Sequence, residues 1–256
     1  MKKYIAALDQ GTTSSRTILF DGDGRAVACA QEEFRQLYPK PGWVEHDCRD
    51  IVRSQLQSFR RALESGGVSA DEIEAIGIAN QRETVVVWDK FTGKPVYNAI
   101  VWQCRRTSEF CEHLKTRHGR AIYDKTGLNV DAYFSASKIK WIFDNVPFAK
   151  RRAEKGELLF GTIDSYLIWV LTGGKVHATD YTNASRTMLF NIHTLEWDRE
   201  LCELFGVPMG MLPAVKPSGA DYGVTDRAVL GAEIPIRAAV GDQQGALFGQ
   251  LCTEAG

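Results

Sequence analysis

The first part of the chain alternates between short apolar runs and polar turns, a pattern typical of β-strands. Apolar runs cover residues 4–8, 16–20 and 26–33, and each has the length of a strand that is buried on at least one face. The sequence DGDG at 21–24 separates the second run from the third. It predicts a tight hairpin because glycine accepts a positive φ at little cost. The chain is therefore predicted to open with a three-stranded meander.

A helix is predicted next, because apolar positions recur at spacings of three and four. Asp47 stands where it can cap the first turn, and the pair Gly66-Gly67 can end the last one. The apolar positions that share one face are Ile51, Val52, Leu56, Phe59 and Leu63. This stripe predicts an amphipathic helix that packs on one face of the sheet.

Strands and helices alternate through the rest of the chain. Further strands are predicted at 73–79, 84–88, 96–102, 158–163 and 236–240. Further helices are predicted at 104–118, 135–145, 148–155, 164–171 and 243–251. A stretch with two prolines, 212–223, is expected to be a long surface connection. A meander followed by alternating helices and strands predicts an α/β fold with a mixed central sheet flanked by helices.

Composition and charge narrow the classes of function. The chain has 256 residues, of which 44% are hydrophobic and 25% charged, as in an ordinary globular protein. With 31 basic and 32 acidic residues, it lacks the basic surface expected of a protein that binds nucleic acid or anionic membranes. No apolar run reaches the ~20 residues that span a bilayer. Six cysteines without a C-x-x-C pair predict free thiols in a reducing cytoplasm.

Several well-known catalytic motifs are missing from the sequence. There is no G-x-x-x-x-G-K-[ST], no G-x-G-x-x-G and no H-E-x-x-H, and the five histidines are scattered. Nucleotide binding through a P-loop, a Rossmann domain or a protein-kinase fold therefore has no support, and neither does zinc-dependent hydrolysis.

The first informative motif, DQGTTSSR at 9–16, lies between two predicted strands. Backbone N–H groups and hydroxyls in such a turn can hold phosphate oxygens, and Arg16 can neutralise their charge. Asp9, at the end of its strand, stands where a carboxylate could hold Mg²⁺ or its water shell. The alternative is a hydrophilic hairpin turn with an Asx hydrogen bond.

The second motif, NQRE at 80–83, follows a predicted buried strand. Arg82 supplies only hydrogen-bond donors and Glu83 only acceptors, so the pair can grip two hydroxyls of a polyol. Trp102 could cover the carbon face of such a ligand and Tyr133 could add a hydrogen bond. The alternatives are a solvated salt-bridging loop for the pair and packing roles for the two aromatic residues.

The third motif, GDQQG at 241–245, stands where the last predicted strand meets the last helix. Asp242 there could be a general base that takes a hydroxyl proton during phosphoryl transfer, with Gln243 binding the same substrate. The alternative is that Asp242 is an ordinary helix N-cap.

Taken together, these motifs give the chain a specific resemblance. It resembles the N-terminal domain of the FGGY carbohydrate kinases, which have the actin/hexokinase/Hsp70-like (ribonuclease H-like) fold, and in particular the members that phosphorylate glycerol. The segments that carry the resemblance run along nearly the whole chain: 8–16, 38–47, 80–83, 98–107, 158–169, 179–198 and 241–250.

The resemblance implies that the γ-phosphoryl group of ATP is transferred to a terminal hydroxyl of glycerol, giving sn-glycerol 3-phosphate. It implies phosphate binding by Thr12, Thr13, Ser14 and Arg16 and a Mg²⁺-linked carboxylate at Asp9. It implies glycerol binding by Arg82, Glu83, Trp102, Tyr133, Asp242 and Gln243, with Asp242 as the base.

The resemblance also implies a second domain that is absent from this chain, so residues 1–256 are expected to be an isolated domain with little activity. The parent protein is expected to be a cytoplasmic homo-oligomer. Residues 226–233 lack the Gly-rich basic loop for fructose 1,6-bisphosphate, and no phosphorylatable histidine follows His193. Two other hypotheses stay open: another FGGY sugar or polyol kinase, and a non-catalytic actin-like binding module.

Overall fold

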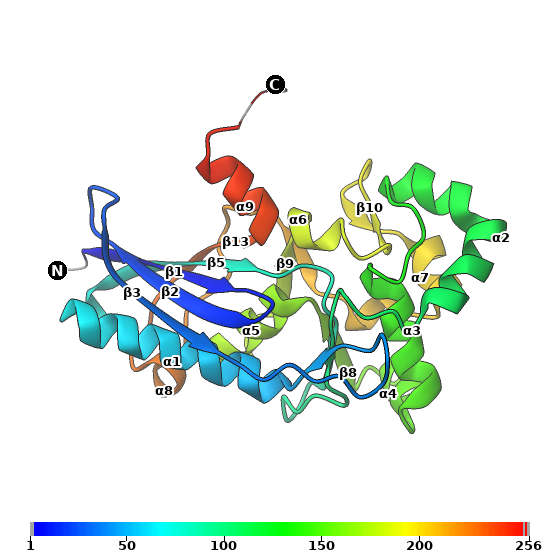
Figure 1. Cartoon of the computed structure of the whole chain (residues 1–256), viewed down its shortest axis with the longest axis horizontal. Helices are drawn as coiled ribbons and strands as arrows, with labels where there is room; N and C mark the ends of the chain where they lie inside the picture. Colours follow the sequence, from blue (N-terminus) through cyan, green and yellow to red (C-terminus); the bar gives the residue numbers. More distant parts are fainter. Residues whose placement is uncertain (1–2, 253, 255–256) are drawn as a thin grey trace.

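A five-stranded mixed sheet is the main sheet of the computed structural model, which describes residues 3–252 and 254, and lies in the half of the molecule that holds the N-terminus (Figure 1). Strands β1 (Tyr4–Gln10), β2 (Ser14–Phe20) and β3 (Ala26–Glu33) form the predicted antiparallel meander. β5 (Ile73–Asn80) pairs in parallel with β1, and β13 (Ile236–Gly241) pairs in parallel with β5. The prediction of an α/β fold with a mixed central sheet is therefore confirmed.

Helices α1 (Cys48–Gly66) and α5 (Ile163–Leu171) bury one face of this sheet. Ile51 and Phe59 of α1 belong to the same buried cluster as Leu8 of β1, and each is at most 1% exposed. Such burial stabilises the domain by roughly 1.5–3 kcal/mol for each large apolar side chain, before the cost of ordering is counted.

The predicted ends of α1 are present. The Asp47 carboxylate accepts a hydrogen bond from the backbone N–H of Arg49 at 2.8 Å, and Gly67 ends the helix with a φ of 61°. A left-handed residue at this position costs little because glycine has no Cβ.

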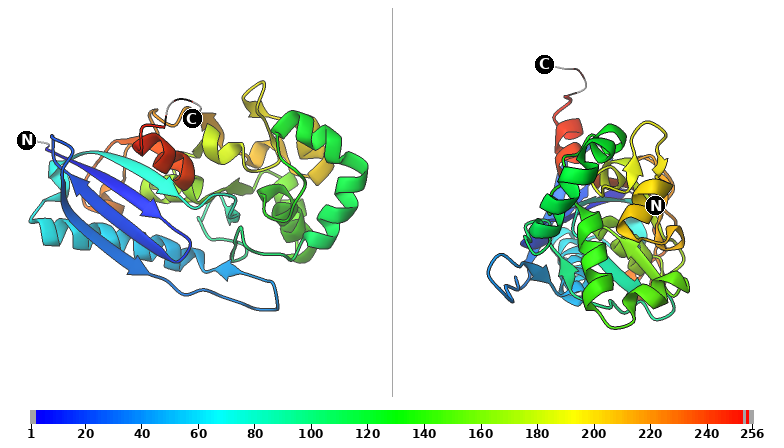
Figure 2. Two further views of the ribbon diagram at one scale, coloured as in Figure 1. Left: turned by 45° about the horizontal axis from the view of Figure 1, so that its top comes forward. Right: turned by 90° about the vertical axis from the view of Figure 1, so that its right-hand side faces the viewer.

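A second buried cluster lies at the other end of the molecule from the N-terminus, where Figure 2 shows a group of helices beyond the sheet. Its helices are α2 (Ser108–Thr126), α3 (Ser135–Asn145), α4 (Ala149–Glu154) and α7 (Arg199–Phe205). They pack beside the antiparallel pair of β6 (Val86–Asp89) and β8 (Leu158–Gly161).

Shorter elements make up the rest of the described chain. The two-stranded pairs are β4 (Glu45–His46) with β7 (Ala99–Ile100), β9 (Ala178–Asp180) with β12 (Ala214–Lys216), and β10 (Phe190–Asn191) with β11 (Glu196–Trp197). The short helices are α6 (Tyr181–Ala184), α8 (Arg227–Leu230) and α9 (Asp242–Gly249), with 3₁₀ turns at Ala70–Glu72 and Met209–Met211. Among the described residues, no helix combines the length and apolar character that crossing a bilayer requires. All six cysteines are unpaired, and four of them are buried.

Most predicted elements are present with ends that differ by one or two residues, but two are misplaced. The strand predicted at 96–102 is only Ala99–Ile100, because its partner β4 has two residues and the N–H of Trp102 donates to the side chain of Thr84. The helix predicted at 104–118 runs instead over Ser108–Thr126. It begins late because the N–H of Arg105 donates to the carbonyl of Gly42.

The stretch at 212–223 runs mostly at the surface, as its prolines suggested, but it also contains a short strand and a buried aromatic side chain. Strand β12 pairs in parallel with β9 inside it, and the side chain of Tyr222 is fully buried. Pro213 and Pro217 flank β12 rather than interrupt it, so neither removes a hydrogen-bond donor from the ladder.

A buried histidine in β4 gives the fold a pH dependence. His46 is fully buried, and burial lowers its pKa from 6.5 to about 4. One ring nitrogen, Nε2, lies 2.7 Å from Oε1 of Gln36, whose own side chain donates to the carbonyl of Thr12. Because Oε1 accepts, the neutral imidazole carries its proton on Nε2 and supports the turn after β1. A second proton would go to Nδ1, which is buried without a hydrogen-bond partner among the described residues, so charging the ring is unfavourable.

We expect His46 to destabilise the fold in mild acid. The unfolded chain binds a proton below pH 6.5 and the folded chain only near pH 4, so the free energy of unfolding should fall by ~1.4 kcal/mol per pH unit between these values. Urea unfolding at pH 7 and pH 5 measures this loss in the wild type and in His46→Gln, which cannot be protonated. Equal pH dependence in both proteins would contradict the expectation.

Candidate active site

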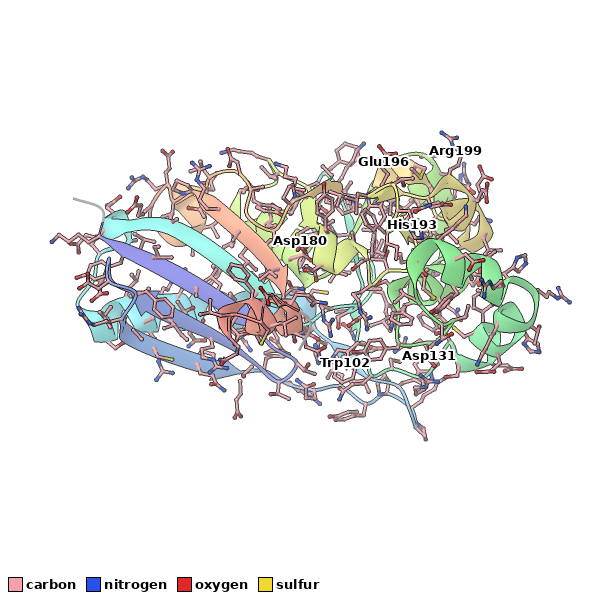
Figure 3. All side chains as sticks on the ribbon, turned by 90° about the horizontal axis from the view of Figure 1, so that it is seen from above. Trp102, Asp131, Asp180, His193, Glu196 and Arg199 are labelled. Atoms are coloured by element: carbon pink, nitrogen blue, oxygen red, sulfur yellow. The ribbon has the colours of Figure 1, made fainter. Side chains whose placement is uncertain are left out.

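Three parallel strands end side by side, and one of the three polar motifs follows each of them. Gln10 at the end of β1 lies opposite Asn80 of β5, and Asn80 lies opposite Gly241 of β13. Ligands of α/β sheets bind beyond the carboxyl ends of such strands. Seen from above, Trp102 and Asp180 lie just beyond these ends, toward the helical part of the domain (Figure 3).

The turn after β1 directly contacts Trp102, the aromatic residue predicted to cover a ligand. The N–H of Gly11 donates to the carbonyl of Ser14 at 2.9 Å, which closes the turn. The indole Nε1 of Trp102 donates to the hydroxyl of Thr12 at 3.0 Å, and Gln36 donates to the carbonyl of Thr12 at 3.1 Å. Residues that are ninety positions apart therefore meet at one end of the sheet.

Asp9 and Arg16, on neighbouring strands, face each other. A nitrogen of Arg16 lies 3.1 Å from the Asp9 carboxylate, and the two side chains are 46% and 36% exposed. Thr13 is also exposed, while the hydroxyl of Ser14 accepts a hydrogen bond from Gln31 at 3.0 Å. An ion pair this exposed contributes little to stability, so both charged groups can exchange partners when an anion or cation arrives.

Arg82 and Asp242 form a pair across β5 and β13. Nε of Arg82 lies 3.2 Å from the Asp242 carboxylate, and Nη1 donates to Gln244 at 3.2 Å. The Arg82 side chain is 5% exposed, whereas that of Asp242 is 40% exposed. A Cβ on Gly241 would lie 2.5 Å from Cδ of Arg82, so the glycine before Asp242 makes room for the arginine.

Asp242 is the first residue of α9, and the N-cap position belongs to Gly241. Its carboxylate accepts a hydrogen bond from the N–H of Gln243 at 2.8 Å; the Gln243 side chain is exposed. The N–H of Gly241 donates to the hydroxyl of Thr182 at 2.7 Å. The reading of Asp242 as an ordinary N-cap is therefore wrong for this helix.

The Glu83 side chain is almost completely buried, and both its carboxylate and its backbone carbonyl are held by hydrogen bonds. Its carboxylate accepts a hydrogen bond from Nε of Arg186 at 2.6 Å, and its backbone carbonyl accepts one from Ser135 at 3.0 Å. Burial raises the pKa of this carboxyl group, while Arg186 acts in the opposite direction. Its φ of 60° is left-handed, a strained conformation that the surrounding contacts must maintain. A solvated loop, the alternative for this motif, does not describe these contacts.

Aromatic side chains form one side of the site. The rings of Trp102 and Tyr133 are 5.3 Å apart, and the guanidinium group of Arg186 lies over Tyr133 at 5.6 Å and over Phe134 at 4.9 Å. Such contacts add cation–π attraction to packing. Burial also raises the pKa of Tyr133, so its hydroxyl stays protonated and able to donate.

Three residues of this arrangement were missed by reasoning from the sequence: Arg186, Gln244 and Thr182. One feature of the sequence could have pointed to Arg186: it is the only charged residue between Asp180 and His193. The contact of Gln244 with Arg82 depends on how the last helix is turned, which residue spacing does not reveal.

A sheet in the order β13-β5-β1-β2-β3, with its antiparallel meander at one edge and polar residues at the ends of its parallel strands, is the arrangement of an α/β domain of the actin and hexokinase class. The model of the FGGY family of carbohydrate kinases, N-terminal domain, matches residues 4–249. The chain belongs to the FGGY family of carbohydrate kinases.

Curated relatives and solved structures agree with this assignment. A glycerol kinase of Caldanaerobacter subterraneus is 61% identical over the whole chain, and one of Treponema denticola is 62% identical. The chain covers 52% of each, so it spans about half the length of these relatives. A glycerol kinase of Plasmodium falciparum, solved with ADP, superposes with a TM-score of 0.92 at 37% identity, over 97% of this chain and 50% of that one.

Proposed function

We propose that the chain is the N-terminal domain of an ATP-dependent kinase that phosphorylates glycerol to sn-glycerol 3-phosphate. The observation that carries the proposal is the cluster of Arg82, Glu83, Trp102, Tyr133 and Asp242 beyond the carboxyl ends of the sheet. Relatives named glycerol kinase, about 60% identical over the whole chain, support the choice of glycerol among the alcohols.

In the proposed reaction each residue has one task. Arg82 donates hydrogen bonds to hydroxyls of glycerol and Glu83 accepts one, while Trp102 covers the carbon atoms. Tyr133 and Gln243 add hydrogen bonds. Asp242 takes the proton of the attacking hydroxyl as its oxygen bonds to the γ-phosphorus and the bond to the β-phosphate breaks, which releases ADP.

The turn of Thr12, Thr13 and Ser14, together with Arg16, is the proposed site for the phosphates of ATP. Asp9 is the proposed carboxylate for Mg²⁺. The donor fits this ion: Asp9 supplies one partly exposed carboxylate, and Mg²⁺ typically takes one or two carboxylates plus phosphates and water. Bound there, the ion would neutralise charge on the phosphate oxygens.

The remaining proposals concern the parent protein. Because the chain spans about half of its curated relatives, we expect a second domain to supply the adenine pocket and the other wall of the cleft. The unpaired cysteines, four of them buried, fit work in the reducing cytoplasm. The parent is expected to be a homo-oligomer.

Steady-state kinetics of the full-length protein with ATP and Mg²⁺ test the function. We expect kcat/KM for glycerol to exceed that for xylulose and gluconate by at least ~10²-fold, because the site pairs each hydroxyl with a fixed polar group. Turnover of xylulose or gluconate in preference to glycerol would identify another FGGY sugar kinase. Glycerol binding without turnover would identify a non-catalytic module.

Replacing Glu83 with alanine tests the polyol site. The substitution leaves a glycerol hydroxyl without its acceptor, at a cost of ~1–3 kcal/mol, so KM for glycerol should rise ~5–150-fold. KM for ATP should stay unchanged, and Glu74→Ala, at the exposed start of β5 and far from its carboxyl end, should change neither value. An equal loss of affinity for glycerol and ATP would contradict the assignment.

A further inference from the structure

Arg186 contacts two of the proposed glycerol-binding residues although it lies far from both in the sequence. It donates to the Glu83 carboxylate at 2.6 Å across 103 residues, and its guanidinium group lies over the ring of Tyr133. Its side chain is 25% exposed, whereas that of Glu83 is 1% exposed. The arginine therefore stands between solvent and a buried acid.

The turn that carries Arg186 is fixed to the end of β5. Asn183, three residues earlier, exchanges two hydrogen bonds with Asn80, at 2.9 Å and 3.1 Å. The carbonyl of Thr187, one residue later, accepts a hydrogen bond from the N–H of Ala136 in α3 at 2.9 Å. Arg186 is thus anchored on both sides, to the strand before Glu83 and to the helix after Tyr133.

The geometry leaves one Glu83 oxygen for a ligand. Arg186 donates to Oε1, and Oε2 accepts no hydrogen bond from the residues that the structure describes. Buried acids tend to bind a proton, and a protonated carboxyl group loses acceptor capacity. An adjacent guanidinium group favours the ionised carboxylate and so makes this protonation less favourable.

We propose that Arg186 is a positioning residue for the acceptor alcohol, keeping Glu83 ionised and aiming its second oxygen at a substrate hydroxyl. This inference rests on the proposed function. The other charged groups that face Glu83 are Arg82, after the same strand, and Lys138 of α3. Arg82 is a cation, whereas burial lowers the pKa of Lys138 to about 7, and the Tyr133 hydroxyl also faces Glu83. Among these groups, Arg186 is the one that donates a hydrogen bond to the carboxylate.

Loss of Arg186 is expected to shift the acid limb of the pH profile of kcat/KM for glycerol. In Arg186→Gln the pKa of Glu83 rises, because a cation next to the carboxylate is lost, so kcat/KM for glycerol should begin to fall at a higher pH than in the wild type. KM for glycerol should rise about tenfold or more at neutral pH, with KM for ATP unchanged. Arg186→Lys keeps the charge and should restore most of the wild-type pH profile. Arg120→Gln, which breaks an exposed ion pair with Asp124 within α2, should leave the profile unchanged.

Carboxyl ¹³C NMR of this chain measures the pKa of Glu83 without any turnover, with Glu83→Gln to assign the signal. A higher pKa in Arg186→Gln than in the wild type, with Arg186→Lys in between, is the expected result. The same pKa in all three proteins would overturn the role of Arg186, whether or not the full-length protein phosphorylates glycerol. A wild-type protein that fails to use glycerol would instead overturn the proposed function.

Discussion

Replacing Asp242 with asparagine is expected to lower kcat by ~10²–10⁴-fold, as for other positioned general bases, while folding and glycerol binding survive. Asparagine has nearly the same shape, and its side-chain oxygen can still accept from the N–H of Gln243 and from Arg82. It cannot take a proton from the attacking hydroxyl. The substitution therefore separates proton transfer from structure.

A matched control is Asp226→Asn. Asp226 is a true N-cap, since its carboxylate accepts from the N–H of Ala228 at 2.9 Å at the start of α8. Asparagine and aspartate cap about equally well, so this variant should be silent. Thermal unfolding and steady-state kinetics of both variants in the full-length protein decide the matter. An unchanged kcat in Asp242→Asn would leave the carboxylate only its ion pair with Arg82 and remove the base from the mechanism.

The residues that follow strand ends could be predicted from the sequence. Asp9, Arg82 and Asp242 each stand within three residues of the end of an apolar run that is readable without a structure. Parallel strands then bring those ends to one edge of the sheet. Trp102 was also predicted, although its predicted strand is largely absent: its indole reaches Thr12 from a turn.

What the sequence could not reveal depends on side-chain direction and on contacts between distant segments. Arg186 comes from a turn 103 residues after Glu83, and nothing in its spacing points to that acid. The start of α2 depends on Gly42, which binds the N–H of Arg105 from a loop more than sixty positions earlier. Periodicity reports which residues are buried together locally, but not which distant backbone group satisfies a given N–H.

The pKa of Glu83 illustrates the same limit. Burial raises this pKa and the neighbouring Arg186 lowers it. The pKa therefore depends on both residues together and cannot be predicted from either one in the sequence. The site is therefore best viewed as one electrostatic unit made of β5, the turn after α6 and the start of α3.

The chain of residues 1–256 by itself is expected to fold and yet to retain less than ~1% of the turnover of the full-length protein. Phosphoryl transfer depends on positioned groups in a cleft from which water is excluded, and losing even one stabilising donor costs ~10²–10³-fold. The proposed base is 40% exposed here, so water competes with the acceptor alcohol for the Asp242 carboxylate.

Circular dichroism and thermal unfolding establish whether this chain is folded, and a coupled assay with ATP, Mg²⁺ and glycerol measures its turnover beside that of the full-length protein. Turnover of ~1–100 s⁻¹, the range of complete kinases, from the chain alone would show that residues on this side of the cleft suffice. A folded chain that binds glycerol but does not turn it over would place the missing stabilisation in the second domain. Glycerol binding and catalysis would then be separable functions. Arg82 and Glu83 would carry the binding, and catalysis would depend on the second domain covering Asp242.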